Sequence, residues 1–395
     1  MAIAGYIKES MERSSWIRKM FEEGIKLKAR LGEENVFDFS LGNPDLDPPE
    51  KFFETLRIFS KDIVKGAHGY MPNAGFPSVR KAVADKVSKE HGIAVSADNI
   101  VMTCGAAGGL NTVLKTILDP GDEVVVPRPY FAEYNFYINN HNGVVRLADS
   151  KADFSLDIST IRKAISDKTK AVLINSPNNP TGRVYSEKQI EELSDMLNEF
   201  HATGQTIYIV SDEPYREIVY DGIAVPSILA HYPHSIVVNS YSKSLSIPGE
   251  RIGYVAANPS CEDIEKLMEG LILCNRILGF VNAPALMQRM VAELKDVTVD
   301  ITPYRKRRDL LAGGLKSAGY SFPLPEGAFY IFCKSPIDDD VKFVQHLQTF
   351  NILAVPGSGF GGPGYFRIAY CVPEDVIRRS ITKFEEALDK LSVNP

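Results

Sequence analysis

The sequence predicts an α/β fold in which helices cover both faces of a mainly parallel β-sheet. Through the middle of the chain, short strand-like runs alternate with helix-length amphipathic segments, which is the order that builds such a sheet. The runs are β-branched and almost continuously apolar, as strands buried on both faces are. The last hundred residues follow a different pattern and predict a smaller α+β domain. A length of 395 residues is also enough for two domains.

Six runs are expected to form the strands of the sheet: 99–102, 123–126, 171–174, 206–210, 235–238 and 254–256. A helix over 110–118 follows the first run. Another is expected over 186–201, because Ser186 and Gln189 form a capping-box pattern before an apolar stripe, and Gly204 can end it.

The C-terminal part predicts a basic helix over 304–315, short strands over 328–332 and 365–369, and a final helix from Glu374. We therefore expect a large domain over 45–285. The smaller domain is expected to combine 1–44 with 286–395.

Composition excludes several classes of function. The net charge of −6 argues against a nucleic-acid-binding protein, which needs a clustered basic surface. No apolar stretch approaches the ~20 residues that span a bilayer. The five cysteines are scattered without a CxxC pair, which predicts reduced thiols, a cytoplasmic location and no metal site.

Ligands of parallel α/β sheets collect beyond the carboxyl ends of the strands, so the loops that follow the runs are candidate sites. Small residues over 103–109 follow the first run. They suit either a phosphate held at a helix start or a tight turn. They match neither the dinucleotide fingerprint nor the P-loop.

Three further loops carry polar residues. The loop over 175–182 is either a Pro/Asn/Gly turn or an amide aimed at a ligand. Asp212 and Glu213 follow the fourth run and suit a helix cap, a cation or, less well without nearby His or Cys, a metal. Lys243 lies in a Ser-rich loop, and Arg251 follows eight residues later, after a Pro-Gly bend.

Together these loops resemble the class I/II aminotransferases, fold-type I enzymes that depend on pyridoxal 5′-phosphate (PLP). The motifs occur in the family's order and at its usual separations: Ser-x-Ser-Lys…Pro-Gly-x-Arg-x-Gly at 240–253, Asn-Asn-Pro-Thr-Gly at 178–182, Asp-Glu-Pro-Tyr at 212–215 and Phe-Arg-Ile at 366–368. The resemblance covers nearly the whole chain and implies the family's fold, its PLP cofactor and its amino acid and 2-oxo acid substrates.

The resemblance also implies roles at the cofactor ring. Lys243 matches the lysine that holds PLP as a Schiff base and then moves the substrate proton, which burial favours by lowering a lysine pKa. Asp212 matches the carboxylate that keeps the pyridine nitrogen protonated. Asn179 and Tyr215 match the pair that binds the ring hydroxyl, and Tyr130 matches the aromatic residue that stacks on the ring.

Another set of matching residues is expected to hold the cofactor phosphate: Gly105, Ala106, Ala107, Ser240, Ser242 and Arg251. Alanine at 106 and 107 supplies no side-chain hydroxyl there. Tyr70 resembles a tyrosine that reaches the phosphate of the neighbouring subunit, which implies a homodimer with shared sites.

At the substrate, Arg367 resembles the arginine that binds the α-carboxylate through two hydrogen bonds. Gly42 and Asn43 resemble the segment that closes over this carboxylate, together with Asn179. Arg276 lies near the position where some relatives supply an arginine for a distal carboxylate. It is otherwise a helix-surface residue, so aspartate, aromatic and neutral amino acids all stay open.

The implied reaction is ping-pong transfer of an amino group from an amino acid to a 2-oxo acid. A fold-type I lyase, either a carbon–sulfur β-lyase or an enzyme like aminocyclopropane-carboxylate synthase, would use the same Lys243, Asp212 and Arg251. A PLP-sensing transcription factor would need a DNA-binding domain before Phe39. A nucleotide-binding protein with a doubly wound sheet would leave those three residues unexplained.

Overall fold

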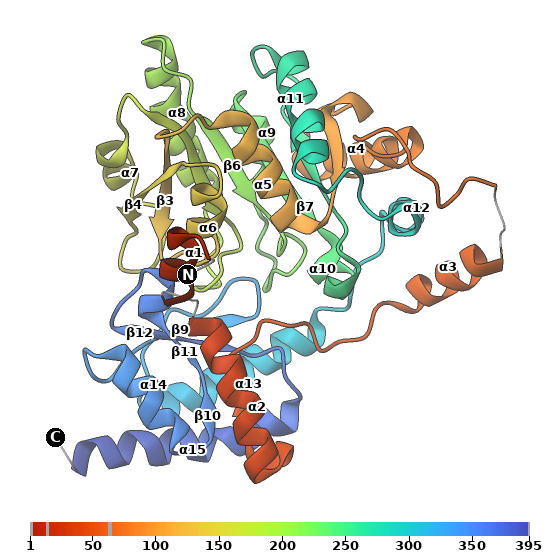
Figure 1. Cartoon of the computed structure of the whole chain (residues 1–395). Coiled ribbons are helices and arrows are strands. Elements are labelled where there is room, and N and C mark those ends of the chain that lie inside the picture. The colour runs from red at the N-terminus through yellow and green to blue at the C-terminus, as the bar shows by residue number, and fades with distance from the viewer. Residues whose placement is uncertain (1–2, 13–15, 62–64, 394–395) are drawn as a thin grey trace.

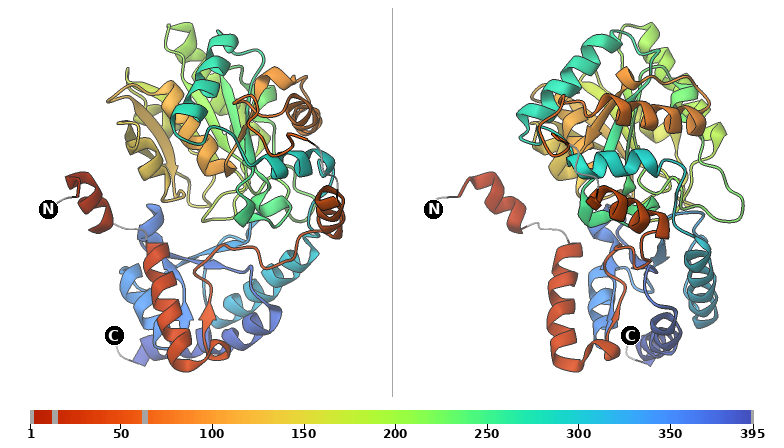
Figure 2. Two further views of the ribbon diagram at one scale, coloured as in Figure 1. Left: turned by 45° about the vertical axis from the view of Figure 1, so that its right-hand side comes forward. Right: turned by 90° about the vertical axis from the view of Figure 1, so that its right-hand side faces the viewer.

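The computed structural model describes residues 3–12, 16–61 and 65–393. A large sheet with its helices forms the upper part in Figure 1, and a smaller part lies below it. Figure 2 shows the same two parts from two further sides. Among the described helices, none combines the length and apolar character that a membrane crossing requires.

The large sheet has seven strands in the order β2-β8-β7-β6-β5-β3-β4. Their bounds are β2 Ile100–Thr103, β3 Glu123–Arg128, β4 Val144–Asp149, β5 Thr169–Asn175, β6 Tyr208–Asp212, β7 Ser235–Ser240 and β8 Gly253–Ala257. Only β8 is antiparallel to its neighbours, and all other pairs are parallel. The predicted mainly parallel α/β sheet is therefore confirmed.

Helices cover both faces of this sheet (Figure 1). One face packs against α5 Gly105–Ile117, α6 Tyr134–Asn139 and α11 Ile264–Ile277. The other packs against α4 Pro77–His91, α7 Ile158–Ala164, α8 Glu187–Ala202, α9 Ile228–His231 and α12 Ala285–Glu293. Successive strand residues point to opposite faces, so Val124 joins one core and Val125 the other. This double burial explains the continuous apolar runs.

The smaller part contains an antiparallel sheet in the order β11-β12-β9 and a parallel pair, β1 with β10. Its strands are β1 Phe37–Asp38, β9 Tyr330–Lys334, β10 Ile352–Leu353, β11 Val355–Pro356 and β12 Tyr365–Ala369. Its helices are α2 Trp16–Leu31, α13 Thr302–Ala318, α14 Asp340–Gln348 and α15 Glu374–Val393. The N-terminal α2 packs beside this C-terminal sheet.

Three of the described α-helices lie outside these groups, and one of them is the short α10 Tyr241–Ser244 after β7. α1 Gly5–Glu12 precedes α2, and α3 Glu50–Lys61 packs against α12. The division at 45 and 285 stays a prediction, and α12, just beyond it, packs against α4 on the large sheet.

Six predicted strands are present with ends shifted by a few residues, and β4 is an unpredicted edge strand. The helix expected over 110–118 begins at Gly105, so the small residues form its first turn rather than a loop. The capping box of Ser186 and Gln189 is confirmed at the start of α8, which ends at Ala202.

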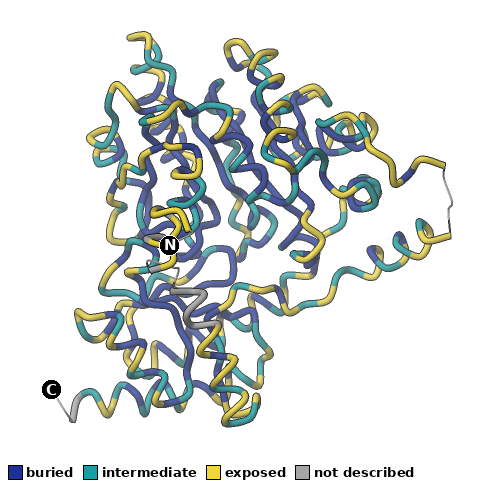
Figure 3. Tube along the Cα trace, viewed as in Figure 1, coloured by how far each residue is buried: buried dark blue, intermediate teal, exposed yellow. Residues whose placement is uncertain are grey.

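The strand directions bring the polar loops to one edge of the sheet. The carboxyl ends of β2, β5, β6 and β7 meet there, and β8 starts at the same edge because it runs in the opposite direction. This edge faces the smaller part (Figure 1). Figure 3 shows a nearly continuous buried interior through both parts.

Candidate active site

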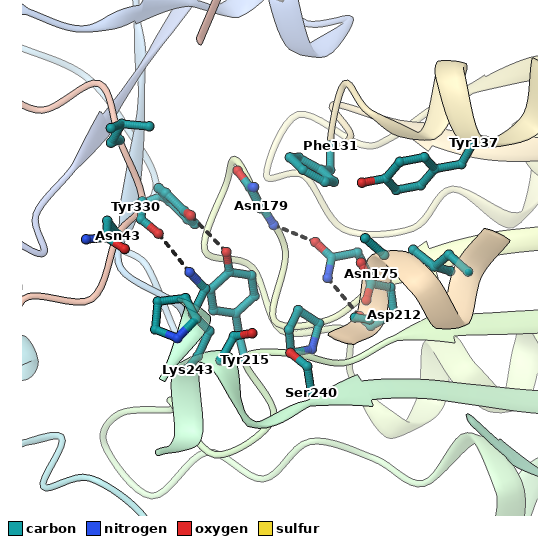
Figure 4. Close-up of a pocket in the computed structure, with 18 of the residues that line it drawn as sticks. Asn43, Phe131, Tyr137, Asn175, Asn179, Asp212, Tyr215, Ser240, Lys243 and Tyr330 are labelled. Atoms are coloured by element: carbon teal, nitrogen blue, oxygen red, sulfur yellow. Dashed lines mark hydrogen bonds between the residues drawn. The ribbon is translucent and has the colours of Figure 1, made fainter. Parts of the chain in front are cut away.

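A cavity of ≈ 400 Å³ lies at this edge and is lined from both parts of the molecule (Figure 4). Its lining is Leu41, Gly42, Asn43, Ala106, Ala107, Leu110, Phe131, Tyr137, Asn175, Asn179, Asp212, Pro214, Tyr215, Ser240, Ser242, Lys243, Pro248, Arg251, Tyr330 and Arg367. The polar side chains that were predicted from separate loops therefore converge on one space.

Lys243 stands in the short helix α10 Tyr241–Ser244, directly after β7. Its Nζ donates a hydrogen bond to the Gly42 carbonyl at 2.8 Å. Burial lowers the pKa of Lys243 to about 8, and the positive charges of Arg251 and Arg367 act in the same direction. A larger fraction of the amine is therefore neutral and nucleophilic near neutral pH than in an ordinary lysine.

Asp212 ends β6 and is buried at the base of the cavity. Its Oδ2 accepts a hydrogen bond from the Tyr134 hydroxyl at 2.6 Å, whereas its Oδ1 has no hydrogen-bond partner among the described residues. Burial raises the pKa of Asp212 to about 7. A buried oxygen without a partner is costly, so this carboxyl group is arranged for a donor from a ligand.

Glu213, the next residue, points away from the cavity and has its own partners. Its carboxylate accepts hydrogen bonds from Arg216 Nη1 at 2.9 Å and from the Ser211 hydroxyl at 2.8 Å. Of the alternatives that the sequence leaves open for this acidic pair, Glu213 pairs with a cation and Asp212 faces the cavity.

The loop after β5 connects Asp212 to Arg367. Asn175 Nδ2 donates to the Asp212 carbonyl at 2.8 Å, and Asn175 Oδ1 accepts from the Asn179 backbone N–H at 2.7 Å. Asn179 Oδ1 in turn accepts from Arg367 Nη1 at 3.0 Å. The side-chain amide of Asn179 therefore contacts the guanidinium of Arg367, and its role is not limited to forming a turn.

Arg367 is a buried cation that has no carboxylate partner within the described part of the chain. It lies on β12 with 1% of its surface exposed, and its Nη2 donates to the Ser40 carbonyl at 2.6 Å. The guanidinium carbon is 4.6 Å from the ring centroids of both Tyr330 and Phe360. Its Nε finds no hydrogen-bond partner in residues 3–12, 16–61 and 65–393. A buried, incompletely paired guanidinium favours an anionic ligand.

Tyr215 and Tyr330 form a pair of hydroxyls 2.8 Å apart at the cavity wall (Figure 4). Gly42 packs so closely on Tyr330 that a Cβ at this position would lie 1.9 Å from the Tyr330 hydroxyl. Only glycine fits there. The closing segment Gly42–Asn43 thus depends on Tyr330 for its position.

The start of α5 is a candidate binding site for an anion. The N-cap residue Cys104 gives no side-chain cap, so the first backbone N–H groups of the helix are free for a ligand. Gly105 has φ +71, and a Cβ there would lie 2.7 Å from Arg251 Nη2. The absence of a side chain at Gly105 lets Arg251 approach this helix end.

Comparison with known proteins agrees with this geometry. The sequence profile of the family "Aminotransferase class I and II" matches residues 34–384. The chain belongs to the class I and II aminotransferases.

Individual relatives of this aminotransferase span nearly its whole length. The aspartate/prephenate aminotransferase of Thermus thermophilus is 33% identical, over 92% of this chain and 94% of its own. Aromatic-amino-acid aminotransferase 2 of Thermococcus litoralis is 31% identical, over 96% and 95%. The crystal structure of an aminotransferase from Eubacterium rectale has a TM-score of 0.95, 39% identity and 99% coverage of both chains.

As a member of this family the chain is a PLP-dependent transaminase with a fold-type I architecture. The residues present fit the cofactor. The unpartnered Asp212 Oδ1 matches the N–H of a protonated pyridine ring, and the uncapped start of α5 beside Arg251 matches a phosphate.

Four expected site residues lie outside the cavity lining. Among the described residues, Tyr130 is not part of the cavity lining, because its ring packs in the core and its hydroxyl pairs with Asn135. Tyr70 is 94% exposed, and Arg276 is exposed on α11. Neither lines the cavity of its own chain. Gly105 lies behind the lining, next to Arg251.

Several cavity residues were not predicted. Phe131, adjacent to Tyr130, lines the cavity and contacts the ring of Tyr134 edge-on at 5.6 Å. Asn175 begins the loop over 175–182, which the sequence predicts as a candidate site. Tyr330 lies in an expected strand, but nothing in the neighbouring sequence indicates that its side chain faces the cavity. The hydrogen bond between Tyr134 and Asp212 joins distant parts of the chain, so only the folded structure reveals it.

Proposed function

We propose that Lys243, Asp212 and Arg367 carry out amino-group transfer in this cavity, each with a separate task. One observation supports this most strongly. Among the residues that the structure describes, the cavity joins an amine of lowered pKa, a buried carboxyl oxygen without a hydrogen-bond partner and a buried guanidinium without a counter-ion. When bound, PLP supplies an aldehyde for the amino group and a ring that withdraws electrons from the reacting carbon.

Each residue acts through a stated atom. Lys243 Nζ holds the cofactor and then moves the proton at the substrate Cα. Asp212 Oδ1 accepts the ring N–H, and Tyr134 holds the other oxygen in place. Arg367 binds the α-carboxylate, and Gly42 and Asn43 close over it.

The cofactor's remaining groups have further partners. Asn179 and Tyr215 bind the ring hydroxyl. The start of α5, Ser240, Ser242 and Arg251 hold the phosphate. We assign the ring-facing aromatic role to Phe131, because Phe131 lines the cavity and Tyr130 does not.

For the substrate side chain, we propose an uncharged, preferably aromatic, group. The cations of the described lining are Lys243, Arg251 and Arg367, and each already has a task. A distal carboxylate would be left without a partner and would cost binding energy. The rest of the lining includes Phe131 and Tyr137, which suit an aromatic ring.

We further propose a cytoplasmic homodimer with shared sites. Tyr70 is 94% exposed in one chain although it matches a family site position, which is the arrangement expected if it serves a second copy. The five free cysteines support a reducing compartment.

A transamination assay tests this proposal. Purified, PLP-loaded protein is given a panel of amino acids with a 2-oxo acid acceptor, and both products are quantified. We expect turnover to be highest with aromatic or neutral donors and to be abolished in Lys243→Ala. Lys188→Ala, an exposed lysine on α8, is the matched control and should behave as wild type.

Three outcomes would contradict it. Wild-type turnover in Lys243→Ala would remove Lys243 from the reaction. Preference for aspartate that disappears in Arg276→Ala would assign the distal cation to Arg276 and overturn the substrate class. Release of ammonia without an acceptor would indicate the lyase alternative.

A further inference from the structure

Three side chains gather at the edge of the large sheet opposite to Lys243. His201 lies near the C-terminus of α8, His234 directly precedes β7, and Glu262 lies between β8 and α11. Since Lys243 follows the far end of β7, the cluster and the cavity lie at opposite ends of the sheet. The aminotransferase reaction does not use these side chains.

The geometry of the cluster suits a metal ion. One ring nitrogen of each histidine and a carboxylate oxygen of Glu262 all lie within 4.8 Å of one another. The two imidazole rings are 4.5 Å apart between centroids, at 44°. Ligands in a tetrahedral zinc site lie about 3.4 Å apart, given Zn–N bonds of about 2.0 to 2.1 Å. Small rotations of the three side chains would therefore bring their ligand atoms to metal-binding distance.

Neighbouring groups already orient both imidazoles. His201 Nδ1 lies 3.0 Å from the Thr206 hydroxyl, and His234 Nδ1 lies 3.7 Å from Cys261 Sγ. Partners of this kind fix the ring and leave Nε2 for the metal, as in protein zinc sites. The rings of Tyr208 and Tyr232 pack edge-on against His234.

The charge state also suits an ion. Within the described residues Glu262 makes no ion pair with a lysine or arginine, and its carboxylate is exposed. No metal-ligand spacing is visible in the sequence because the three residues come from three separate segments.

We propose that His201, His234 and Glu262 form a binding site for a divalent transition metal ion such as Zn²⁺. Two imidazoles and one carboxylate leave a fourth position for water. The site ties the end of α8 to the start of β7 and to the segment before α11. Its expected role is to stabilise the fold, because it lies far from the reacting groups.

The test uses untagged, PLP-loaded protein from which metals have been removed with a chelator. Calorimetric titration with Zn²⁺ alone should show one saturable site per chain. Zn²⁺ should also raise the unfolding temperature by a few degrees. Glu262→Gln should weaken binding by about tenfold or more, and because Glu262 is exposed this variant retains its packing. His201→Gln should do the same.

A second group provides the matched control. Glu187, Glu191 and His231 also lie within metal-binding distance of one another, but both carboxylates are exposed and Glu187 already contacts His231 at 3.4 Å. Glu187→Gln with His231→Gln should leave Zn²⁺ binding unchanged. Absence of saturable binding to the wild type, or equal binding by Glu262→Gln, would overturn the proposal. Loss of binding in the control variant would do so as well. None of these outcomes depends on transaminase activity.

Discussion

At the residue scale, Asp212 is the group whose state depends most on a ligand. Its buried Oδ1 lacks a partner, and Tyr134 holds Oδ2. Asp212→Asn keeps the shape but removes the charge that stabilises a protonated pyridine ring. We expect kcat to fall by about a hundredfold. Tyr134→Phe, which loosens the carboxylate without removing it, should cause a smaller loss.

Asp212 also predicts a pH dependence of stability in the cofactor-free protein. Burial raises its folded pKa to about 7 from an ordinary value of 3.8. Between these values the folded state holds a proton that the unfolded state has lost. Its contribution is therefore present at low pH and is lost as pH rises to about 7, by up to about 4 kcal/mol.

Urea unfolding at several pH values measures this contribution. The difference in free energy of unfolding between wild type and Asp212→Asn should change across pH 4 to 7 in cofactor-free protein. A constant difference across this range would show that Asp212 does not titrate in this way.

Phe131 and Tyr130 offer a second test at this scale. Phe131 lines the cavity, whereas Tyr130 packs in the core with its hydroxyl on Asn135. Phe131→Ala should weaken retention of PLP by about tenfold or more, because stacking area is lost. Tyr130→Phe keeps the core packing and should retain PLP as wild type does. Fluorescence titration of cofactor-free protein with PLP gives both affinities, and the reverse ranking would restore Tyr130 as the stacking residue.

The sequence identifies Lys243 and Arg367 as candidate site residues because each lies within an ordered motif, and both line the cavity. It does not predict Tyr134 or Tyr330, since their contacts with Asp212 and Tyr215 join segments distant in the chain. Our proposed stacking aromatic, Phe131, lies one residue after the Tyr130 that the sequence suggests, because two adjacent aromatics fit the same pattern and only Phe131 lines the cavity.

At the scale of elements, the start of α5 decides how the phosphate is held. Gly105 combines φ +71 with close approach to Arg251. Gly105→Ala should displace Arg251 and weaken PLP binding by about tenfold or more, in addition to backbone strain of about 1 kcal/mol. Gly121→Ala is the control, since Gly121 has φ +90 and nothing within 4 Å.

Both variants should lose similar stability in thermal unfolding, and only Gly105→Ala should lose cofactor affinity. Equal PLP affinities in the two variants would contradict the role of this turn.

Apolar runs predict the central strands because these are buried on both faces. The sequence does not predict β4, because this strand lies at the edge of the sheet and most of its residues are exposed. It therefore lacks a continuous apolar run. The start of α5 is placed too late by the sequence because glycine and alanine carry no amphipathic signal.

At the scale of the whole molecule, the exposed Tyr70 predicts that one chain is an incomplete enzyme. A mass of 43.7 kDa per chain should double in sedimentation analysis. Tyr70→Phe should weaken PLP retention although Tyr70 lies outside its own cavity. A monomer with full activity, or unchanged retention in Tyr70→Phe, would contradict shared sites.

The central claim is that this cavity transfers an amino group and keeps it until an acceptor arrives. Mixing PLP-loaded protein with a single amino acid, without any 2-oxo acid, and counting the 2-oxo acid released tests it most directly. The account predicts one equivalent per cavity, no free ammonia, and further release only after an acceptor is added. Continued release with ammonia, or no release with any amino acid, would contradict it.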